Sequence, residues 1–232
     1  LFYNNSAWDE EDGSAGEADD HAIAADKVAL WHGMKADFAN YTSYSKGING
    51  LMIDMRDLPG TPTLDDFLFR TGNDSYPYGH DTQDPEDDWP WAPDPIAITV
   101  RPGAGQDGAD RVTLIWADNA VRKCWLQVTV LATDVTGLTK DEVFYVGNVV
   151  GDSGNSDSHT AVNVVDALEV RANPHTLLNP APIDDVFDFN RDKQVNVQDE
   201  LLVRANPTTR LTDLKLIDLT ASGGDRGAGR NR

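Results

Sequence analysis

Oxygen-bearing side chains recur at regular intervals in the stretch VFDFNRDKQVNVQDELLVRANP, which spans residues 186–207. Calcium prefers six to eight oxygen ligands, and a tight loop that runs into a helix can bring that many together. Counted from Asp188 as position 1, the candidate ligands at positions 3, 5, 7, 9 and 12 are Asn190, Asp192, Gln194, Asn196 and Asp199. Gln194 would contribute its backbone carbonyl. The stretch therefore predicts a calcium loop followed by a short helix, which Asn206-Pro207 ends.

A second copy of this phrase lies earlier in the chain, at a constant offset of 33 residues over the part that runs into the helix. Its candidate ligands at positions 1, 3, 5, 7, 9 and 12 are Asn155, Asp157, His159, Ala161, Asn163 and Asp166. His159 is an unusual calcium ligand, so water or Asp152 would take its role, or the site is weak. A single Asp/Asn-rich stretch is often only a polar turn, but two copies with aligned helices favour a duplicated calcium-binding motif.

The two copies together resemble a dockerin domain, in which two EF-hand-like loop–helix segments are each closed by Asp at position 12. The match covers residues 148–218, and the sequence departs from the pattern at His159 and at Lys193, where the loop favours glycine. Dockerins dock onto cohesin modules through their helices. The resemblance implies a partner-binding face made of Leu168, Val170, Arg171, Leu201, Leu202 and Arg204. Alternatively, the leucines and valines among them pack the two helices together.

Short apolar segments separated by Gly, Pro, Asn and Asp occupy most of residues 27–150. They are rich in Val, Ile, Thr and aromatic residues, which is typical of strands in an antiparallel β-protein. Because side chains alternate along a strand, Val112, Leu114 and Trp116 would share one face, as would the alternate apolar residues of 126–130. The expected strands lie within residues 27–31, 35–43, 49–58, 66–72, 96–103, 110–118, 125–133 and 141–150.

The phrases FYNNSAWD, FANYTSYSKGINGLMIDM and RVTLIWADNAVR make residues 1–150 similar to a β-sandwich module. That module stands directly before dockerin-like repeats in secreted multidomain proteins of planctomycete-type environmental bacteria, and it has no catalytic assignment. The expected fold is mainly β: an antiparallel β-sandwich of jelly-roll or cohesin-like type over 1–150. A small α-helical dockerin-like domain with two calcium loop–helix repeats follows at 151–219, and a flexible Gly/Arg tail at 220–232.

A long Pro-rich segment at residues 72–95 interrupts the strand pattern. Its aromatic side chains, Tyr76, Tyr78, Trp89 and Trp91, are candidates for a carbohydrate-stacking platform or a protein contact. The alternative is that the tryptophan rings fold back over the sheets.

Composition excludes several classes of function. A net charge of −20 over 232 residues argues against nucleic-acid binding, which usually needs a basic surface. Cys124 is the only cysteine, so no intrachain disulfide forms, and no apolar run approaches the ~20 residues of a membrane span. The five histidines form no metalloprotease spacing, and Ser153 in the phrase GDSG lacks a catalytic framework. We therefore expect no enzyme.

The sequence favours an extracellular, secreted or cell-surface structural module with calcium as its cofactor. Calcium would order the C-terminal repeats, which then contact a protein partner, either a cohesin-like module or another copy of the chain. Head-to-tail contact between two different surfaces does not close and would give filaments. The alternative function is a carbohydrate-binding module that uses the Trp/Tyr loop at 76–91, with the dockerin-like repeats as an anchoring tail and a polysaccharide as partner.

Overall fold

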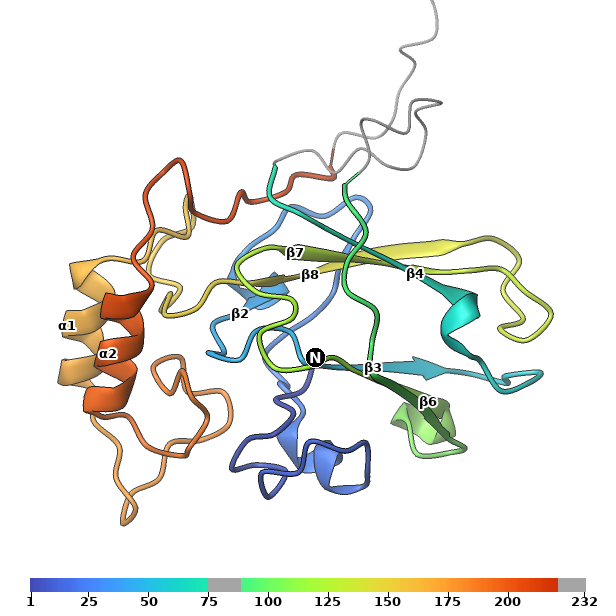
Figure 1. Ribbon diagram of the computed structural model, residues 1–232, viewed down its shortest axis with the longest axis horizontal. Coiled ribbons are helices and arrows are strands. Elements are labelled where there is room, and N and C mark those ends of the chain that lie inside the picture. Colours follow the sequence, from blue (N-terminus) through green and yellow to red (C-terminus); the bar gives the residue numbers. More distant parts are fainter. Residues whose placement is uncertain (75–88, 221–232) are drawn as a thin grey trace, which may run out of the picture.

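The computed structural model describes residues 1–74 and 89–220. This part of the chain is mainly β, with two sheets and two short α-helices (Figure 1). The strands are β1 (Leu30–Trp31), β2 (Tyr41–Thr42), β3 (Gly50–Met55), β4 (Phe67–Gly72), β5 (Ala97–Arg101), β6 (Asp110–Ile115), β7 (Trp125–Val130) and β8 (Glu142–Asn148). Each lies inside one of the eight segments expected from the sequence, which confirms those predictions. Thr220 apart, the predicted tail at 220–232 lies outside the described residues.

One sheet has the strand order β1-β8-β7-β4, and the other has the order β3-β6-β5. Pairing is antiparallel except where β2 runs parallel to β8, with Tyr41 opposite Gly147. The prediction of wholly antiparallel sheets is therefore wrong for this pair. The cause is the path of the chain. Both β1 and β2 pair with β8, at successive positions along it, and the chain reverses its direction in the connection between them, residues 32–40.

The first hydrophobic core lies where the two sheets face each other. Val112, Leu114 and Trp116 belong to it together with Leu126 and the alternate apolar residues that follow on β7. These are the residues whose alternation predicted a common buried face, and that prediction is confirmed. Burial of such side chains, each giving about 1.5–3 kcal/mol, holds the two sheets together.

A second hydrophobic core covers the opposite face of β7 and β8. Trp125 and Tyr145 point into it from the sheet, and Val170, Phe189 and Val203 enter it from the two predicted repeats. The chain after the second helix also contributes, since Leu214 and Ile217 are buried there. Apolar packing thus continues across the predicted boundary at residue 150, although the division into domains itself remains a prediction.

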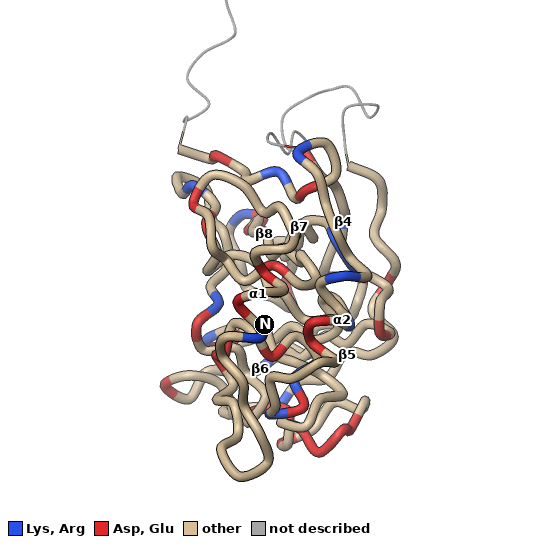
Figure 2. The backbone as a smooth tube through the Cα atoms, turned by 90° about the vertical axis from the view of Figure 1, so that its left-hand side faces the viewer, with Lys and Arg blue, Asp and Glu red and all other residues tan. Residues whose placement is uncertain are grey.

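The two α-helices, α1 (Val164–Ala172) and α2 (Val197–Ala205), lie side by side at one end of the molecule (Figure 1). Both begin with the same capping box. The side chain of the N-cap asparagine accepts a hydrogen bond from the helix, and the aspartate at the third helical position accepts one from the N-cap amide. The first turn of each helix carries acidic residues, Asp166 in α1 and Asp199 and Glu200 in α2, as the helix dipole favours; Figure 2 faces this end of the molecule.

Candidate metal centre

The second repeat folds its two terminal aspartates into the interior. Asp188 and Asp199 are both fully buried. Oδ1 of Asp199 accepts the backbone N–H of Phe189 at 2.9 Å, so the end of the predicted loop closes onto its beginning. Oδ2 of Asp188 accepts the N–H of Lys193 at 2.9 Å, which curls the loop around its first residue. This geometry brings carboxylate oxygens from both ends of the loop into one place.

The remaining candidate ligands of this loop lie between those ends. Oδ1 of Asp192 accepts the N–H of Gln194 at 2.9 Å, and the amide of Asn190 donates to Oδ2 of Asp192 at 2.9 Å. Asn196 caps α2 through its Oδ1, at 2.7 Å from the N–H of Gln198. Among the described residues none donates to the carbonyl of Gln194, so that oxygen remains available to a cation. The donors are all hard oxygens, the type that calcium takes.

Electrostatics in the second loop disfavour the charged state of its carboxylates. Burial raises the pKa of Asp188 to about 7, and the neighbouring charges of Asp199 and Asp192 add to the rise while Arg191 opposes it. Burial likewise raises the pKa of Asp199 to about 6. A bound cation would reverse this balance, because an opposite charge nearby stabilises the ionised carboxylates.

The loop also contains two residues in the left-handed region, Arg191 at φ 56° and Lys193 at φ 67°. Lys193 is the position at which the sequence pattern favours glycine, so the strain expected there is present. The Arg191 side chain is buried. Its guanidinium donates to the Tyr3 hydroxyl at 2.9 Å and to the carbonyl of Asp185, and it stacks 4.2 Å from the Tyr3 ring centroid. Arg191 thus ties the second loop to the N-terminal segment.

In the first repeat, Asp152 takes the place that Asp188 has in the second. The N–H of the residue after it, Ser153, donates to Oδ1 of Asp166 at 3.1 Å, as Phe189 does to Asp199. Asp152 is buried, and burial raises its pKa to about 6. Asn155, the predicted first ligand, lies three residues further on. The structural equivalence therefore moves position 1 from Asn155 to Asp152 and makes the first loop three residues longer than the second.

Donor groups of the protein occupy the carboxylates of the first loop. Ser153 Oγ bridges Asp166 Oδ1 at 2.8 Å and Glu169 Oε2 at 2.6 Å, and the Asn155 amide donates to the same two oxygens. The Tyr41 hydroxyl donates to Asp152 Oδ2 at 2.6 Å. A cation would have to displace these contacts, so we expect the first loop to bind more weakly than the second.

The other predicted ligands of the first loop are placed differently. Asn163 caps α1, and its amide donates to the carbonyl of Ala161 at 2.8 Å, which uses the predicted main-chain ligand. Asp157 is exposed, and with His159 it lines a shallow cavity that also contains Arg210 and Lys215. His159 Nδ1 accepts the N–H of Ala161 at 3.3 Å. These two side chains therefore border a surface of mixed charge, since Asp213 and Asp218 line it as well.

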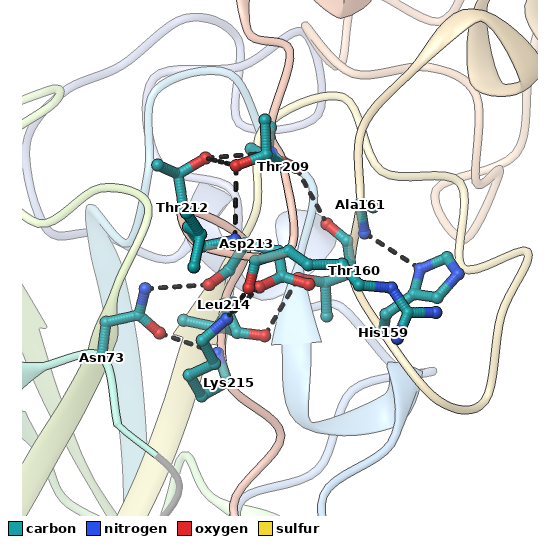
Figure 3. A network of polar contacts seen from close by, with 12 residues as sticks. Asn73, His159, Thr160, Ala161, Thr209, Thr212, Asp213, Leu214 and Lys215 are labelled. Carbon is teal, nitrogen blue, oxygen red and sulfur yellow. Dashed lines mark hydrogen bonds and ion pairs between the residues drawn. The ribbon is translucent and has the colours of Figure 1, made fainter.

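Figure 3 shows how the chain after α2 fastens the first loop to the sheets. The Thr160 hydroxyl donates to the carbonyl of Leu214 at 3.1 Å. Asn73, at the end of β4, donates to the carbonyl of Asp213 and accepts the N–H of Lys215 at 2.7 Å. The sequence patterns did not indicate this connection.

The predicted partner-binding residues divide between the surface and the core. Leu168 and Leu201 are exposed at equivalent positions of α1 and α2. Val170 is buried and Leu202 is partly buried against the second core, so these two residues contribute to the packing of the helices, as the alternative interpretation expects. Arg171 and Arg204 both pair with Glu200, and Arg171 does so through two hydrogen bonds of 2.6 Å.

The two tryptophans of the Pro-rich segment also differ. Trp89 is 5% exposed, packs against Tyr145 and donates to Asp74 at 2.6 Å. It covers the sheet and presents no free stacking surface. Trp91 is 61% exposed, and the Arg70 guanidinium lies 4.0 Å from its ring centroid. Tyr76 and Tyr78 lie outside the described residues.

Two further findings concern the described part of the chain as a whole. No group of three or more His, Cys, Asp or Glu side chains within residues 1–74 and 89–220 is placed to hold a metal ion. No helix there has the length and apolar character needed to cross a membrane. Comparisons with protein-family models, curated proteins and solved structures find no match to this chain.

Proposed function

We propose that this protein is a non-enzymatic, extracellular calcium-binding assembly module. In this proposal the two sheets form a β-sandwich of the jelly-roll or cohesin-like type, and residues 151–219 form a dockerin-like unit. Calcium occupies the second loop first and fixes the orientation of both helices. The ordered repeats then contact a protein partner, either a cohesin-like module or a second copy of this chain.

The observation that carries the proposal is the closure of both loops by the same contact. In each repeat, the residue after a buried aspartate donates its N–H to the aspartate at the third position of the helix. Two carboxylates from distant positions of each loop are thereby buried near one another, and Arg191 supplies positive charge near the second pair. A divalent cation would offset this repulsion and add to the stability of the folded loops.

The two helices offer the partner-binding surface. Val164 and Leu168 on α1 and Val197 and Leu201 on α2 are exposed, and they stand at equivalent positions of the duplicated unit. Contiguous exposed apolar side chains are typical of protein–protein contacts, and we propose that these four residues form such a surface. Arg171 and Arg204 border them.

Calcium titration by calorimetry, with light scattering at both ends of the titration, tests this function. We expect tight binding at one site, weaker binding at a second, and an increase in mass when calcium is present. EGTA should reverse the increase. A protein that stays monomeric at every calcium concentration and captures no cohesin-like module would contradict the assembly role, and a titration without heat would contradict the calcium loops.

The alternative function, carbohydrate binding, keeps one supporting observation, the exposed ring of Trp91. Its ring face is shared with Arg70, so a sugar would stack there in place of the guanidinium. Binding to a glycan array that Trp91→Ala removes, while calcium-dependent growth in mass is absent, would favour this alternative. Trp89→Ala is not a suitable probe, because Trp89 is buried and its loss would destabilise the sheet.

A further inference from the structure

The N-terminal segment, residues 1–26, is strongly acidic. It contains eight aspartates and glutamates and no lysine or arginine. In Figure 1 it forms the blue loop at the lower edge of the molecule. Two of its carboxylates, Asp9 and Asp19, are fully buried. A buried carboxylate needs hydrogen bonds or a positive charge beside it, so the partners of these two residues decide what the segment can bind.

The two buried carboxylates differ in their partners. Oδ2 of Asp9 accepts the N–H of Asn5 at 2.6 Å, and Oδ1 accepts that of Ser6 at 2.7 Å, so both oxygens are satisfied within the loop. In Asp19, Oδ2 accepts the N–H of Gly16 at 2.9 Å. Its Oδ1 is buried and has no hydrogen-bond partner among the described residues. Asp9 therefore fixes the loop, whereas Asp19 has one oxygen left for a ligand.

No side chain of the described residues pairs with Asp19 to neutralise it. Arg101 acts on it from a distance, but its guanidinium donates to the neighbouring Asp20 through two hydrogen bonds of 3.0 and 2.5 Å. Burial raises the pKa of Asp19 to about 6, and the charge of Asp9 adds to the rise, while the hydrogen bond from Gly16 opposes it. The unpaired oxygen thus lies in negative surroundings that a cation would stabilise.

A second buried oxygen without a partner belongs to Asn4. This residue is 2% exposed, and its Oδ1 accepts no hydrogen bond from the described chain. Tyr3 donates its N–H to the carbonyl of Ala22 at 2.9 Å. The chain that carries Asn4 therefore runs beside the short 3-10 helix Ala18–Ala22, which carries Asp19.

Both side chains also contact the same bend of the loop. The amide of Asn4 donates to the carbonyl of Gly13 at 3.4 Å, and Asp19 accepts the N–H of Gly16. Each unpaired oxygen belongs to the same terminal group that makes this contact, so both oxygens lie at the bend. The carbonyls of residues 14–15 receive no hydrogen bond from the described residues and are available there as well.

We propose that a calcium ion binds between Asn4 and Asp19. Oδ1 of each side chain is a ligand, and main-chain carbonyls of the bend together with water complete the set of oxygens. A buried polar group without a partner is rare in folded proteins and marks the place of an ion or a water. The set combines one carboxylate with neutral oxygens, all of which calcium accepts, and is not a cluster of three acidic side chains.

The site lies outside the two repeats and rests on contacts that the proposed function does not use. Calcium sites of extracellular modules bind with dissociation constants of about 0.1–1 mM, and a single carboxylate ligand places this site in that range. In calorimetry it adds a weak event to the two expected from the repeats.

Amide exchange of the full chain, resolved by segment while calcium is added to the EDTA-treated protein, tests the site. Calcium should slow exchange across residues 4–20, because the ion links Asn4 to Asp19. Asp19→Asn keeps an acceptor for the N–H of Gly16 but removes the charge, so the calcium response of this segment should be lost. In EDTA the variant should be protected at least as well as the unchanged chain, since a buried charge without a partner is gone.

Two further variants sharpen the test. Asn4→Asp adds a carboxylate at the site, so the response of residues 4–20 should move to lower calcium concentrations, while protection in EDTA falls. A site filled only by water would show the lower protection without the shift. Glu17→Gln removes a charge from an exposed side chain of the same segment and is the matched control, which should respond like the unchanged chain.

Exchange across residues 4–20 that ignores calcium, or that responds equally in Asp19→Asn, would overturn the site. An equal response to magnesium would overturn it too, because general screening of the acidic segment would then explain the effect. Residues 186–207, followed in the same samples, report the calcium loops of the repeats. The N-terminal site and the proposed function can therefore fail independently of each other.

Discussion

Replacing Asp199 with alanine is expected to abolish calcium binding at the second loop and to destabilise the repeats by about 2–4 kcal/mol even without calcium. The carboxylate is buried and accepts the backbone N–H groups of Phe189, Asn190 and Asn196. Its removal leaves these donors unsatisfied and takes away the capping box of α2. Amide exchange across residues 186–207 should accelerate, while the strands β6 and β7 keep their protection.

The loosening should also reach one face of the sheet. Trp125 shares the second hydrophobic core with Phe189 and Val203, so its fluorescence should shift towards the emission of a more exposed indole. This effect differs from the expectation for a repeat unit that folds independently, which would leave Trp125 unchanged.

Two substitutions serve as controls for Asp199→Ala. Asp199→Asn keeps an oxygen that can accept the backbone N–H groups but removes the charge, so calcium affinity should fall while stability without calcium changes less. Asp184→Asn removes a charge from an exposed neighbour and should change neither quantity. Unaltered amide exchange across the loop in Asp199→Ala would show that the carboxylate does not hold the repeat together.

Local sequence signals predicted the strands well, because their cause is local. Each strand of the described chain alternates or concentrates apolar residues between turn formers, and burial then decides which face turns inward. The helices were predicted from the run that follows each loop and from the Asn-Pro pair that ends it, and the structure adds a further local feature, the capping box at the start of both helices.

What escaped prediction depends on contacts between distant residues. The 33-residue offset placed Asn155 opposite Asp188, whereas the first loop is three residues longer and Asp152 is the equivalent residue. Only the folded contact from Ser153 to Asp166 shows this. The available signal was Asp152, directly before Ser153. An alignment without a gap could not place Asp152 opposite Asp188. The parallel pairing of β2 and the packing of the repeats on Trp125 likewise follow from the path of the chain. No periodic pattern in the sequence indicates either of them.

The composition of the chain gave no reason to expect a buried arginine, yet Arg191 is buried. Replacing Arg191 should have the largest effect on the free energy of unfolding. Arg191→Ala breaks the hydrogen bonds to Tyr3 and Asp185 and leaves the buried carboxylate of Asp188 without its nearest positive charge. Removal of the buried guanidinium leaves the Tyr3 hydroxyl and the Asp185 carbonyl without this partner, at a cost of about 1–3 kcal/mol for each group that stays buried and unsatisfied. The positive φ of this residue does not change the comparison, because arginine and alanine both carry a Cβ.

In the proposed calcium site, the cation would bind the folded loop and supply the positive charge that Asp188 lacks, so calcium should recover part of that loss. Denaturant unfolding of Arg191→Ala should therefore show a larger deficit in EDTA than in calcium. Arg204→Ala is the matched control: the Arg204 side chain is exposed and Glu200 keeps its two hydrogen bonds from Arg171, so its removal should cost less than about 1 kcal/mol in either condition. If Arg191→Ala lowers the free energy of unfolding equally with and without calcium, Arg191 does not interact with the cation site. Its role would then be only the structural contact with Tyr3.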